Sequence, residues 1–559
     1  MKIQQRIYSE PGYQALANAG CVPVLARLLS ARGIADSTEL RQEMAQLLTP
    51  QQLSGCKEMA MLLAEAILQQ KQILIIGDYD ADGATATSVA MLGLRAFGAT
   101  VDFLVPNRFE YGYGLTPEIV ALAAQQRPDV ILTVDNGIAS IEGVAAAKAL
   151  GMQVLITDHH LPAAETPAAD CIVNPNQRGC DFPSKHLAGV GVMFYVLIAL
   201  RAELRQRGVA GAEQMHLASL LDLVALGTVA DLVRLDANNR ILVRQGLKRI
   251  RQRQARPGIL AVLQLAGRDA SQVSAQDLGF YVGPRLNAAG RLDDMTIGIR
   301  CLLAETMEEA MPYARQLHAL NAERKQIEAE MQWDAMADLE QAFTPGQYTI
   351  SVFQPDWHQG VIGILASRIK ERYHRPVIAF ADAGDGVLKG SGRSIAGLHL
   401  RDALDLVTKQ QPALILKFGG HAMAAGLSIR SEDFLLFQHC FEQVVQSLID
   451  AETLQAVLET DGPLALDEMS LETAEMLANE VWGQGFPQPV FYDRFQVMQQ
   501  RILGEKHLKL RLQKEGQLFE AIYFQHAEPL PEQVAVAYAL QVNEYNGTRS
   551  LQLQVVHAV

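Results

Sequence analysis

The sequence predicts an α/β fold in which a parallel-sheet domain, long connecting helices, a second α/β lobe and a C-terminal β-barrel follow one another. Three observations predict it. Short apolar runs alternate with Ala-rich helical stretches over residues 70–235, which is typical of a parallel sheet covered on both faces. Residues 305–343 contain almost no Gly or Pro. From about residue 460 the pattern changes to short alternating strands, which favours a small barrel.

The parallel-sheet domain is expected at residues 66–300, after a helical segment at 1–65. Its strands are predicted at 73–76, 101–105, 130–134 and 154–156, where apolar residues run without interruption. Crossover helices are predicted between them, at residues 88–97, 117–126 and 141–150. This alternation is what a doubly covered parallel sheet requires.

The remaining domains follow in order. Connecting helices are expected at 301–345, with a plain bundle helix as the alternative. The second α/β lobe, 346–455, has predicted strands at 348–353 and 376–380, a helix at 361–373, and Gly-rich turns at 390–394, 418–421 and 425–426. The barrel, 456–559, is OB-like, and its Asn546-Gly547 dipeptide predicts a hairpin.

Composition limits the function classes. Apolar residues make up 49% of the 559 residues and charged residues 20%, as in an ordinary globular protein. A net charge of −14 argues against coating nucleic acid by bulk charge, but it allows an enzyme with a local basic groove. The six cysteines form no CxxC pair, no apolar run reaches about 20 residues, and no secretory signal is evident. We therefore expect a cytoplasmic protein without a membrane span; the oligomeric state is open, with a monomer favoured.

Acidic and histidine residues follow three predicted strands directly. The carboxyl ends of parallel strands meet at one edge of a sheet, so these residues are expected to converge there although they are far apart in the chain. The three clusters are Asp78-Tyr79-Asp80-Ala81-Asp82-Gly83, Asp135-Asn136-Gly137 and Asp158-His159-His160. A further acid, Asp231, ends the apolar run 220–230, and Asp222 within that run is its rival.

Gathered carboxylates repel one another unless cations neutralise them. Carboxylate and imidazole ligands suit Mn²⁺ or Mg²⁺, and their number suits two ions, the usual arrangement for phosphodiester hydrolysis. A calcium loop is the alternative for the first cluster. An EF-hand needs Glu at the twelfth loop position, however, where this chain has Val89, and the cluster follows a strand rather than a helix.

These clusters, with the segment around Asp231, resemble the four ordered motifs of the DHH phosphoesterase superfamily. Residues 283–291 (Gly-Pro-Arg-Leu-Asn-Ala-Ala-Gly-Arg) and 419–426 (Gly-Gly-His-Ala-Met-Ala-Ala-Gly) resemble the linker and the DHH-associated domain of its RecJ family. The resemblance covers roughly residues 70–430, and the β-rich tail fits the family's OB domain. One departure is that the family usually has three glycines before the later histidine, where this chain has Phe418-Gly419-Gly420-His421.

The resemblance implies hydrolysis of single-stranded DNA from the 5′ end to mononucleotides, in DNA repair and recombination, with a single-stranded-DNA-binding protein as a partner. It implies catalytic metal ligands at Asp80, Asp82, Asp135, His159 and Asp231, with Asp78 and His160 in or beside the site. Asp158 and Asn136 are expected to support the ligands from behind.

Several residues are candidates for binding the strand. The basic run 244–256 predicts a phosphate-tracking wall, with a solvated helix face as the alternative. Lys509 and Arg511, near Phe519, Tyr523 and Phe524, suit a single-strand channel, with core aromatics as the alternative. The Gly-Gly-His segment suits phosphate contacts, with a structural turn as the alternative. The full set of predicted substrate-binding residues is Arg108, Arg285, Asn287, Arg291, His358, Ser367, Arg368, Arg393, Gly419, Gly420, His421, Lys509 and Arg511.

Two other functions compete with the exonuclease. One is a DHH phosphodiesterase of short oligonucleotides or cyclic dinucleotides, which would have no use for the basic run and the β tail. The other is a non-catalytic single-strand-binding scaffold, against which the complete set of predicted ligands argues.

Overall fold

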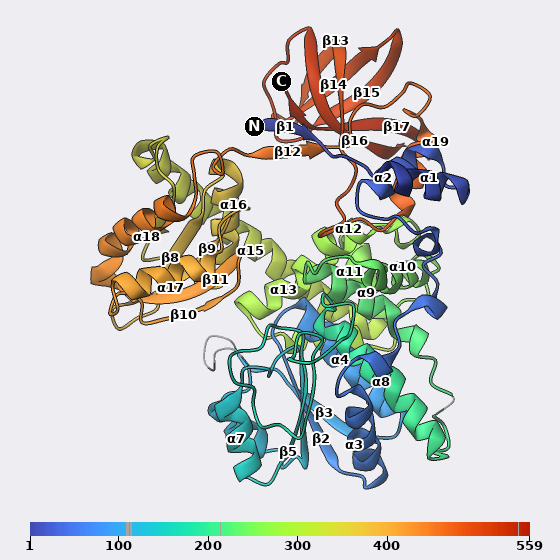
Figure 1. Cartoon of the computed structure of the whole chain (residues 1–559), viewed down its shortest axis with the longest axis vertical. Helices are drawn as coiled ribbons and strands as arrows, with labels where there is room; N and C mark the ends of the chain where they lie inside the picture. Colours follow the sequence, from blue (N-terminus) through green and yellow to red (C-terminus); the bar gives the residue numbers. More distant parts are fainter. Residues whose placement is uncertain (108–110, 112–113, 213, 546) are drawn as a thin grey trace. The chain divides into compact units, whose positions relative to one another are not determined.

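The computed structural model describes residues 1–107, 111, 114–212, 214–545 and 547–559 (Figure 1). The chain divides into two compact units. Unit 1 comprises Met1–Gln4 and Ala319–Leu458, and unit 2 comprises Gln5–His318 and Glu459–Val559. Among the described residues, no helix is long and apolar enough to cross a membrane.

Unit 2 contains a five-stranded sheet of order β3-β2-β4-β5-β6, in which every neighbouring pair is parallel. The sheet and the predicted fold class are therefore confirmed. Its strands are β2 (Gln72–Gly77), β3 (Thr100–Leu104), β4 (Val130–Val134), β5 (Gln153–Thr157) and β6 (Cys171–Val173).

Both faces of this sheet are covered, because its strand residues are apolar on both sides. Leu74 and Ile76 pack with Ile119 of α6 (Pro117–Ala124) and Val144 of α7 (Ile141–Ala149). The opposite face meets α4 (Ala81–Ala96) and α8 (Gly189–Gln206), with α3 (Cys56–Leu68) against β6. Figure 1 shows α7 on one side of these strands and α3 and α8 on the other.

Unit 2 contains further helices. They are α1 (Glu10–Asn18), α2 (Pro23–Ser30), α9 (Leu221–Ala230), α10 (Ala237–Arg251), α11 (Pro257–Leu265), α12 (Ala275–Asp277), α13 (Gly283–Leu292), α14 (Thr296–Leu303) and α19 (Leu471–Asn479), with a π-helical turn at Leu278–Val282. Of these, α19 packs against the barrel strands described below. Short 3₁₀ turns lie at Ser37–Leu40, Met44–Gln46, Pro50–Gln52, Leu217–Leu220 and Ala270–Gln272.

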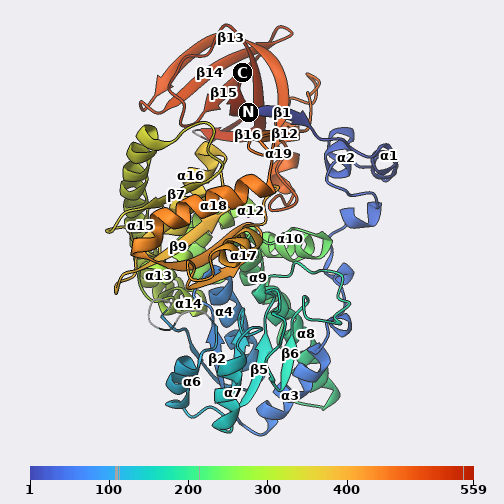
Figure 2. The ribbon, with the colours of Figure 1, turned by 60° about the vertical axis from the view of Figure 1, so that its left-hand side comes forward.

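Unit 1 is built on a mixed sheet of order β10-β11-β9-β8-β7. Its strands are β7 (Ile350–Phe353), β8 (Val377–Asp382), β9 (Val387–Arg393), β10 (Lys417–Gly420) and β11 (Ala424–Arg430), and its helices are α16 (Ile362–Tyr373), α17 (Leu400–Gln410) and α18 (Phe434–Leu448), with a 3₁₀ turn at Ser431–Asp433. Figure 2 shows α17 and α18 in front of β9. A single 36-residue helix, α15 (Met307–Ala342), begins in unit 2 and continues in unit 1.

The three Gly-rich turns predicted in this lobe are wrong, because these glycines belong to strands β9, β10 and β11. For Gly390 and Gly392 of β9 the reason is close packing. A Cβ at Gly390 would lie 2.6 Å from the Phe380 ring, and one at Gly392 would lie 2.8 Å from Leu400 Cδ2. These glycines make room for neighbouring side chains rather than allowing the chain to turn.

The C-terminal strands of unit 2 close into a barrel of order β13-β14-β15-β17-β16, which confirms the predicted barrel. They are β13 (Phe491–Leu503), β14 (His507–Lys514), β15 (Gln517–Tyr523), β16 (Gln533–Tyr545) and β17 (Thr548–Ala558). Strands β16 and β17 pair antiparallel up to Tyr545 and Thr548 on either side of the predicted hairpin, whose Asn546 lies outside the described residues. Near the start of the chain, β1 (Lys2–Gln5) pairs with β12 (Val457–Thr460).

Candidate metal centre

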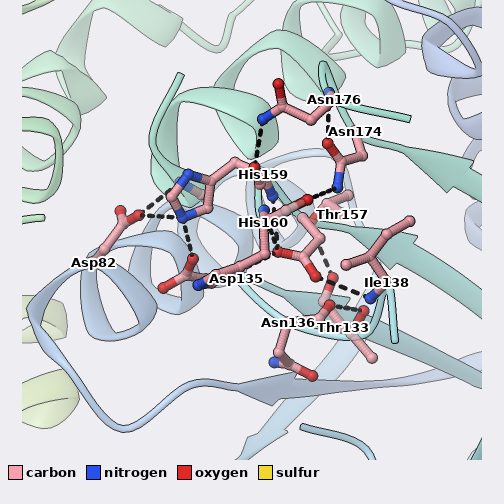
Figure 3. Close-up of polar contacts among 12 residues, drawn as sticks. Asp82, Thr133, Asp135, Asn136, Ile138, Thr157, His159, His160, Asn174 and Asn176 are labelled. Atoms are coloured by element: carbon pink, nitrogen blue, oxygen red, sulfur yellow. Dashed lines mark hydrogen bonds and ion pairs between the residues drawn. The ribbon is translucent and has the colours of Figure 1, made fainter. Parts of the chain in front are cut away.

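The loops that follow β2, β4 and β5 bring their acids and His159 together, as expected for one edge of a parallel sheet. His159 Nε2 lies 3.1 Å from Asp135 Oδ1, 3.5 Å from Asp231 Oδ2 and 3.9 Å from Asp82 Oδ2. Figure 3 shows the imidazole directed at Asp82 and Asp135. Residues from distant parts of the chain thus form one cluster.

The cluster extends to the first acids of the β2 loop. Asp78, Asp80 and Asp135 each offer an oxygen within 4.8 Å of the other two. Of the two candidate acids at α9, Asp222 and Asp231, one joins the cluster and the other does not. Asp231, at the end of the helix, joins the cluster, whereas the buried Asp222 accepts hydrogen bonds from the backbone N–H groups of Leu223 and Arg256 at 2.9 and 2.6 Å.

Asp80 also begins helix α4. It is the N-cap residue, and its Oδ1 accepts hydrogen bonds from the N–H groups of Asp82 and Gly83 at 2.9 and 3.0 Å. Asn287 of α13 accepts a hydrogen bond from the Ala81 N–H group at 2.8 Å. The acidic loop is therefore fixed by its own helix start and by a residue that was predicted to bind substrate.

Asp82 is held at the start of a second helix. Its two oxygens accept hydrogen bonds from the N–H groups of Gly189 and Val190, the first residues of α8, at 2.6 and 3.0 Å. Free N–H groups at a helix N-terminus stabilise a negative charge. Gly189 is required there because a Cβ would lie 2.6 Å from Asp135 Oδ1. Asp135 itself has a left-handed backbone (φ 63°), an uncommon conformation that is found at functional sites.

Burial and crowding raise the pKa values of these carboxyl groups. Desolvation, followed by the charge of Asp80, raises the pKa of Asp82 to about 7. Desolvation and the neighbouring acids also raise the pKa values of Asp135 and Asp231 well above the usual range for Asp. Carboxylates this close repel one another, so the site favours anything that supplies positive charge.

The two histidines differ in charge. Desolvation, followed by the charge of His160, lowers the pKa of His159 to about 4, so its imidazole is neutral at pH 7. His160 Nδ1 lies 2.7 Å from the buried Asp158, whose hydrogen bond and charge outweigh desolvation and raise the pKa of His160 to about 9. The same pair lowers the pKa of Asp158 despite its burial.

These residues fit a divalent cation. Within the described part of the chain, the buried His159 Nε2 has no hydrogen-bond partner, since its approach to Asp135 lacks hydrogen-bond geometry. A neutral imidazole with an unused nitrogen, surrounded by carboxylates, offers the donors that Mn²⁺ and Mg²⁺ accept. Three groups of possible ligands overlap through Asp135 or His159: Asp135, His159 and His160; Asp82, His159 and Asp231; and Asp78, Asp80 and Asp135.

The motif at residues 283–291 supplies internal contacts near this centre. Besides Asn287, the buried Arg285 donates to the Tyr281 carbonyl at 2.6 Å and lies 3.3 Å from His318 Nδ1. Arg291 lies half-buried in α13. Arg108 falls outside the described residues. The binding of substrate by these residues stays a prediction.

The residues predicted in unit 1 also have local partners. Arg368 pairs with Glu328 at 2.8 Å and Glu371 at 3.3 Å. Arg393 donates to Ser391 Oγ at 3.2 Å and to the Gly392 carbonyl at 2.8 Å. The other contacts are Gly360 N–H to His358 Nδ1 at 3.0 Å, Ser367 Oγ to the Gly363 carbonyl at 3.2 Å, and Met423 N–H to His421 Nδ1 at 3.3 Å, while Gly419 and Gly420 end β10. Their part in binding substrate is likewise untested.

On the barrel, Lys509 and Arg511 project outward from β14, between buried leucines that project inward. Both lie near Glu520 of β15, at 3.2 and 3.7 Å. The expectation that Phe519 lies beside them is wrong, because Phe519 is paired with Leu512 and buried in the barrel core. Phe524, by contrast, is 47% exposed and packs edge-on against His507.

The basic run 244–256 has many contacts within the protein, and its role as a phosphate-tracking wall stays a prediction. Its arginines mainly bind neighbouring parts of the protein, while Lys248 is exposed. The contacts are Arg244 to Glu480 at 3.3 Å, Arg249 to the Gln254 carbonyl at 2.8 Å, Arg251 to the Val273 carbonyl at 2.8 Å, Arg253 to Asp269 at 3.6 Å, and Arg256 to the Leu303 and Ala304 carbonyls at 2.6 and 2.9 Å. Several of these arginines therefore already have partners within the fold, whereas Lys248 and Arg253 are exposed.

Sequence reasoning missed the residues that hold the ligand loops in place. Asn174 and Asn176, just after β6, donate hydrogen bonds to the carbonyls of His160 and His159 (Figure 3). Asn136, by contrast, was predicted to support the ligands, and it donates to the carbonyls of Ile76 and Val134 at the ends of β2 and β4. An Asn-Pro-Asn segment after a short strand was the available signal, but such segments are also typical of plain turns.

Comparison with known proteins identifies similar domains and similar full-length proteins. The model of the DHH family N-terminal domain matches residues 72–228, that of the DHHA1 domain 346–447 and that of the RecJ OB domain 460–557. The chain is 51% identical to the single-stranded-DNA-specific exonuclease RecJ of Haemophilus influenzae and 50% identical to that of Escherichia coli, over 95% of this chain and 95% of each relative.

Solved structures agree with these matches. Crystal structures of RecJ from Thermus thermophilus in complex with Mn²⁺ and with Mg²⁺ are 30% and 29% identical, with TM-scores of 0.83 and 0.78. Each covers 100% of this chain, which in turn covers 79% and 78% of those chains. The sheet-edge cluster, the three matched domains and identity along nearly the whole length lead to one conclusion: the chain belongs to the RecJ family of DHH proteins.

Proposed function

We propose that this protein is a metal-dependent exonuclease that hydrolyses single-stranded DNA from the 5′ end and releases mononucleotides. The observation that carries the proposal is the buried cluster of Asp82, Asp135, His159 and Asp231 at the edge of the sheet, in a chain whose relatives are named single-stranded-DNA-specific exonucleases. The 5′ polarity and the mononucleotide product rest on the family resemblance.

We propose that Asp80, Asp82, Asp135, His159 and Asp231, with Asp78 beside them, hold two Mn²⁺ or Mg²⁺ ions, the metals named for the Thermus relative. Such a pair of ions activates water and stabilises the leaving oxygen of a phosphodiester. The protein contributes the fixed ligand set. Asp80 is fixed as the N-cap of α4, and Asp82 is fixed by an N–H group at the start of α8. His159 is neutral at pH 7, so its unprotonated nitrogen can bind a cation.

His160 has a separate part in this proposal. Its side chain is 44% exposed and is charged through its pairing with Asp158. A protonated imidazole at the rim of the centre can donate a hydrogen bond to a phosphate oxygen and stabilise its charge. Asp158 keeps the ring oriented, and its carboxylate also accepts the Ile138 N–H at 2.9 Å.

We further propose that the outer face of β14 and β15 guides the strand. Lys509 and Arg511 offer positive charge there, and Phe524 offers an exposed aromatic ring, a combination that suits a flexible single strand. As a DNA-processing enzyme it is proposed to act in the cytoplasm, in repair and recombination, alongside a single-stranded-DNA-binding protein.

The test is product analysis on single strands labelled at the 5′ or the 3′ end, with Mg²⁺ or Mn²⁺ and with an EDTA control. We expect the 5′ label to appear at once as a mononucleotide, while the 3′ label stays on progressively shorter strands. Fully paired duplex of the same sequence serves as the specificity control. Release of the 3′ label first, or equal activity in EDTA, would contradict the proposal.

A further inference from the structure

The main-chain N–H and carbonyl groups of both His159 and His160 are held by side chains. Asp158 Oδ1 accepts hydrogen bonds from the N–H groups of His159 at 2.7 Å and His160 at 3.1 Å. Asn176 Nδ2 donates to the His159 carbonyl at 2.6 Å, and Asn174 Nδ2 donates to the His160 carbonyl at 2.9 Å. Two N–H groups and two carbonyl groups are thus fixed from opposite sides.

The two asparagines form one unit. Asn174 is fully buried, and its Oδ1 accepts the main-chain N–H of Asn176 at 2.7 Å, so that the Asn174 side chain fixes the backbone of Asn176. They directly follow β6, which pairs in parallel with β5, the strand that leads into Asp158. Figure 3 shows both amides directed at the histidine carbonyls, away from the carboxylates of Asp82 and Asp135.

This arrangement matters because His159 stands on a loop. Its Nε2 must remain close to three mutually repelling acids, and a ligand on a loop holds that position only if its support is rigid. Neither asparagine reaches the ligand atom itself, so each can act only through the backbone of the histidines.

Resting on the proposed function, we propose that Asn174 and Asn176 are positioning residues for the metal centre, which hold His159 and His160 through their carbonyl groups. Groups that orient ligands in this way typically change metal affinity about 10- to 100-fold when removed. The proposal concerns the binding of metal, so it can be tested without any nuclease assay.

The test uses Asn176→Leu and Asn174→Ala in the full-length protein. Asn176→Leu keeps the approximate side-chain shape at a half-buried position but removes the donor. Dissociation constants for Mn²⁺ are measured from the electron paramagnetic resonance signal of the free ion. We expect Mn²⁺ to bind about 10- to 100-fold more weakly to both variants. If the buried Asn174→Ala variant fails to fold, the Mn²⁺ affinity of Asn176→Leu alone tests the proposal.

Gln177→Leu is the matched control. Gln177 is the next residue of the same segment, and its side-chain amide also donates to two main-chain carbonyls, those of Ser54 and Ile172, both at 3.1 Å. Neither partner belongs to the histidine loop. We expect this variant to bind Mn²⁺ within about twofold of the wild type, even if it lowers the melting temperature as much as Asn176→Leu does.

A second measurement separates positioning from catalysis. If the asparagines only hold the ligands, excess Mn²⁺ should restore most of the exonuclease rate of Asn176→Leu, because the reacting groups are intact. Wild-type affinity for Mn²⁺ in Asn176→Leu, or an equal loss in Gln177→Leu, would overturn the proposal. A wild-type protein that binds Mn²⁺ but does not cleave DNA would instead refute the proposed function and leave this inference standing.

Discussion

At the scale of single residues, Asp80 combines two tasks, since it caps helix α4 and faces the other acids of the centre. Asp80→Asn separates them. Asn is as good an N-cap as Asp, so the fold should lose little, whereas the carboxylate is gone. We expect activity to fall by roughly three orders of magnitude, the equivalent of several kcal/mol of electrostatic stabilisation.

The measurement is the initial rate of mononucleotide release with Mn²⁺, together with the binding of a labelled single strand. Binding should stay within about threefold of the wild type, because the proposed strand contacts are elsewhere. Asp80→Ala is the comparison, and it should in addition lose about 1 kcal/mol of stability. Activity retained in both variants would exclude Asp80 as a ligand.

The raised pKa of Asp82 predicts a pH effect on the metal-free enzyme. Its folded-state pKa of about 7 lies above its value in the unfolded chain, about 3.9. A carboxyl with a raised folded-state pKa stabilises the fold while it is protonated. This contribution is complete below about pH 4 and is lost as the pH rises through about 7. Mn²⁺ should compensate for the loss, because it binds the deprotonated form.

Urea unfolding in EDTA at about pH 6 and about pH 8 measures this effect, and a repeat with Mn²⁺ measures the compensation. Asp82→Asn removes the titrating group and should show a weaker pH dependence in EDTA. A metal-free wild type that becomes more stable between the two pH values, by more than the variant does, would contradict the assignment.

The acids and histidines of the centre could be predicted because they directly follow strands. The hydrophobic pattern locates each strand, and the carboxyl ends of parallel strands lie at the same edge of the sheet. The choice between Asp222 and Asp231 could not be predicted from the sequence. Both lie on α9, and only the three-dimensional course of that helix shows that Asp222 turns to the backbone of Arg256 while Asp231 faces His159.

At the scale of elements, helix α8 begins directly at the centre. Gly189→Ala would place a Cβ 2.6 Å from the Asp135 carboxylate and displace either the helix start or Asp135. We expect a loss of about 1–3 kcal/mol in unfolding free energy and weaker binding of Mn²⁺. Denaturant unfolding and Mn²⁺ titration measure the two effects.

Gly191→Ala, two residues farther along the same helix, is the control. There a Cβ would come 3.1 Å from Leu187 Cδ2, the end of a flexible side chain that can move. This variant should retain wild-type affinity for Mn²⁺. If the two variants behave alike, the short contact with Asp135 does not explain the need for glycine at 189.

Close packing also explains why strand β9 was not predicted. The glycines at 390 and 392 favour the prediction of a turn, because glycine is a typical turn residue. In the structure these glycines lie in strands because Phe380 and Leu400 fill the space above them. A demand for space made by residues distant in sequence leaves no local signal.

At the scale of the whole molecule, the barrel face predicts how the enzyme selects long substrates. Glu520 lies within ion-pair distance of both Lys509 and Arg511 and offsets part of their charge. The double variant Lys509→Ala/Arg511→Ala should bind long single strands more weakly, and the slope of log affinity against log salt should fall by about 1.4, or about 0.7 for each lost phosphate contact. Cleavage of dinucleotides should be unchanged.

Glu520→Gln should act in the opposite direction and strengthen the binding of long strands, because it releases both cations. Arg494→Ala is the control, as an exposed arginine of the same barrel on the stretch of β13 that pairs with β16. Fluorescence anisotropy over a series of salt concentrations and strand lengths measures all of these changes. Dinucleotides cleaved as fast as long strands by the wild type would favour the small-substrate phosphodiesterase instead.

The order of the domains could be predicted from periodicity alone, but the role of the basic run 244–256 could not. A sequence shows that arginines are clustered, yet it does not show that Glu480 and several backbone carbonyls, from distant segments, already bind them. Whether a cationic run is free for DNA depends on contacts that only the folded chain defines.

Unit 2 is assembled from both ends of the chain, and this has a consequence for biosynthesis. Arg32, near the N-terminus, has a 1% exposed side chain and binds Asp461 through hydrogen bonds of 2.8 and 3.0 Å. During synthesis the parallel sheet emerges from the ribosome long before residue 461. Until Asp461 has emerged, Arg32 is a charged group without this counterion. Nascent chains that stop before this point should keep the first helices vulnerable to proteases.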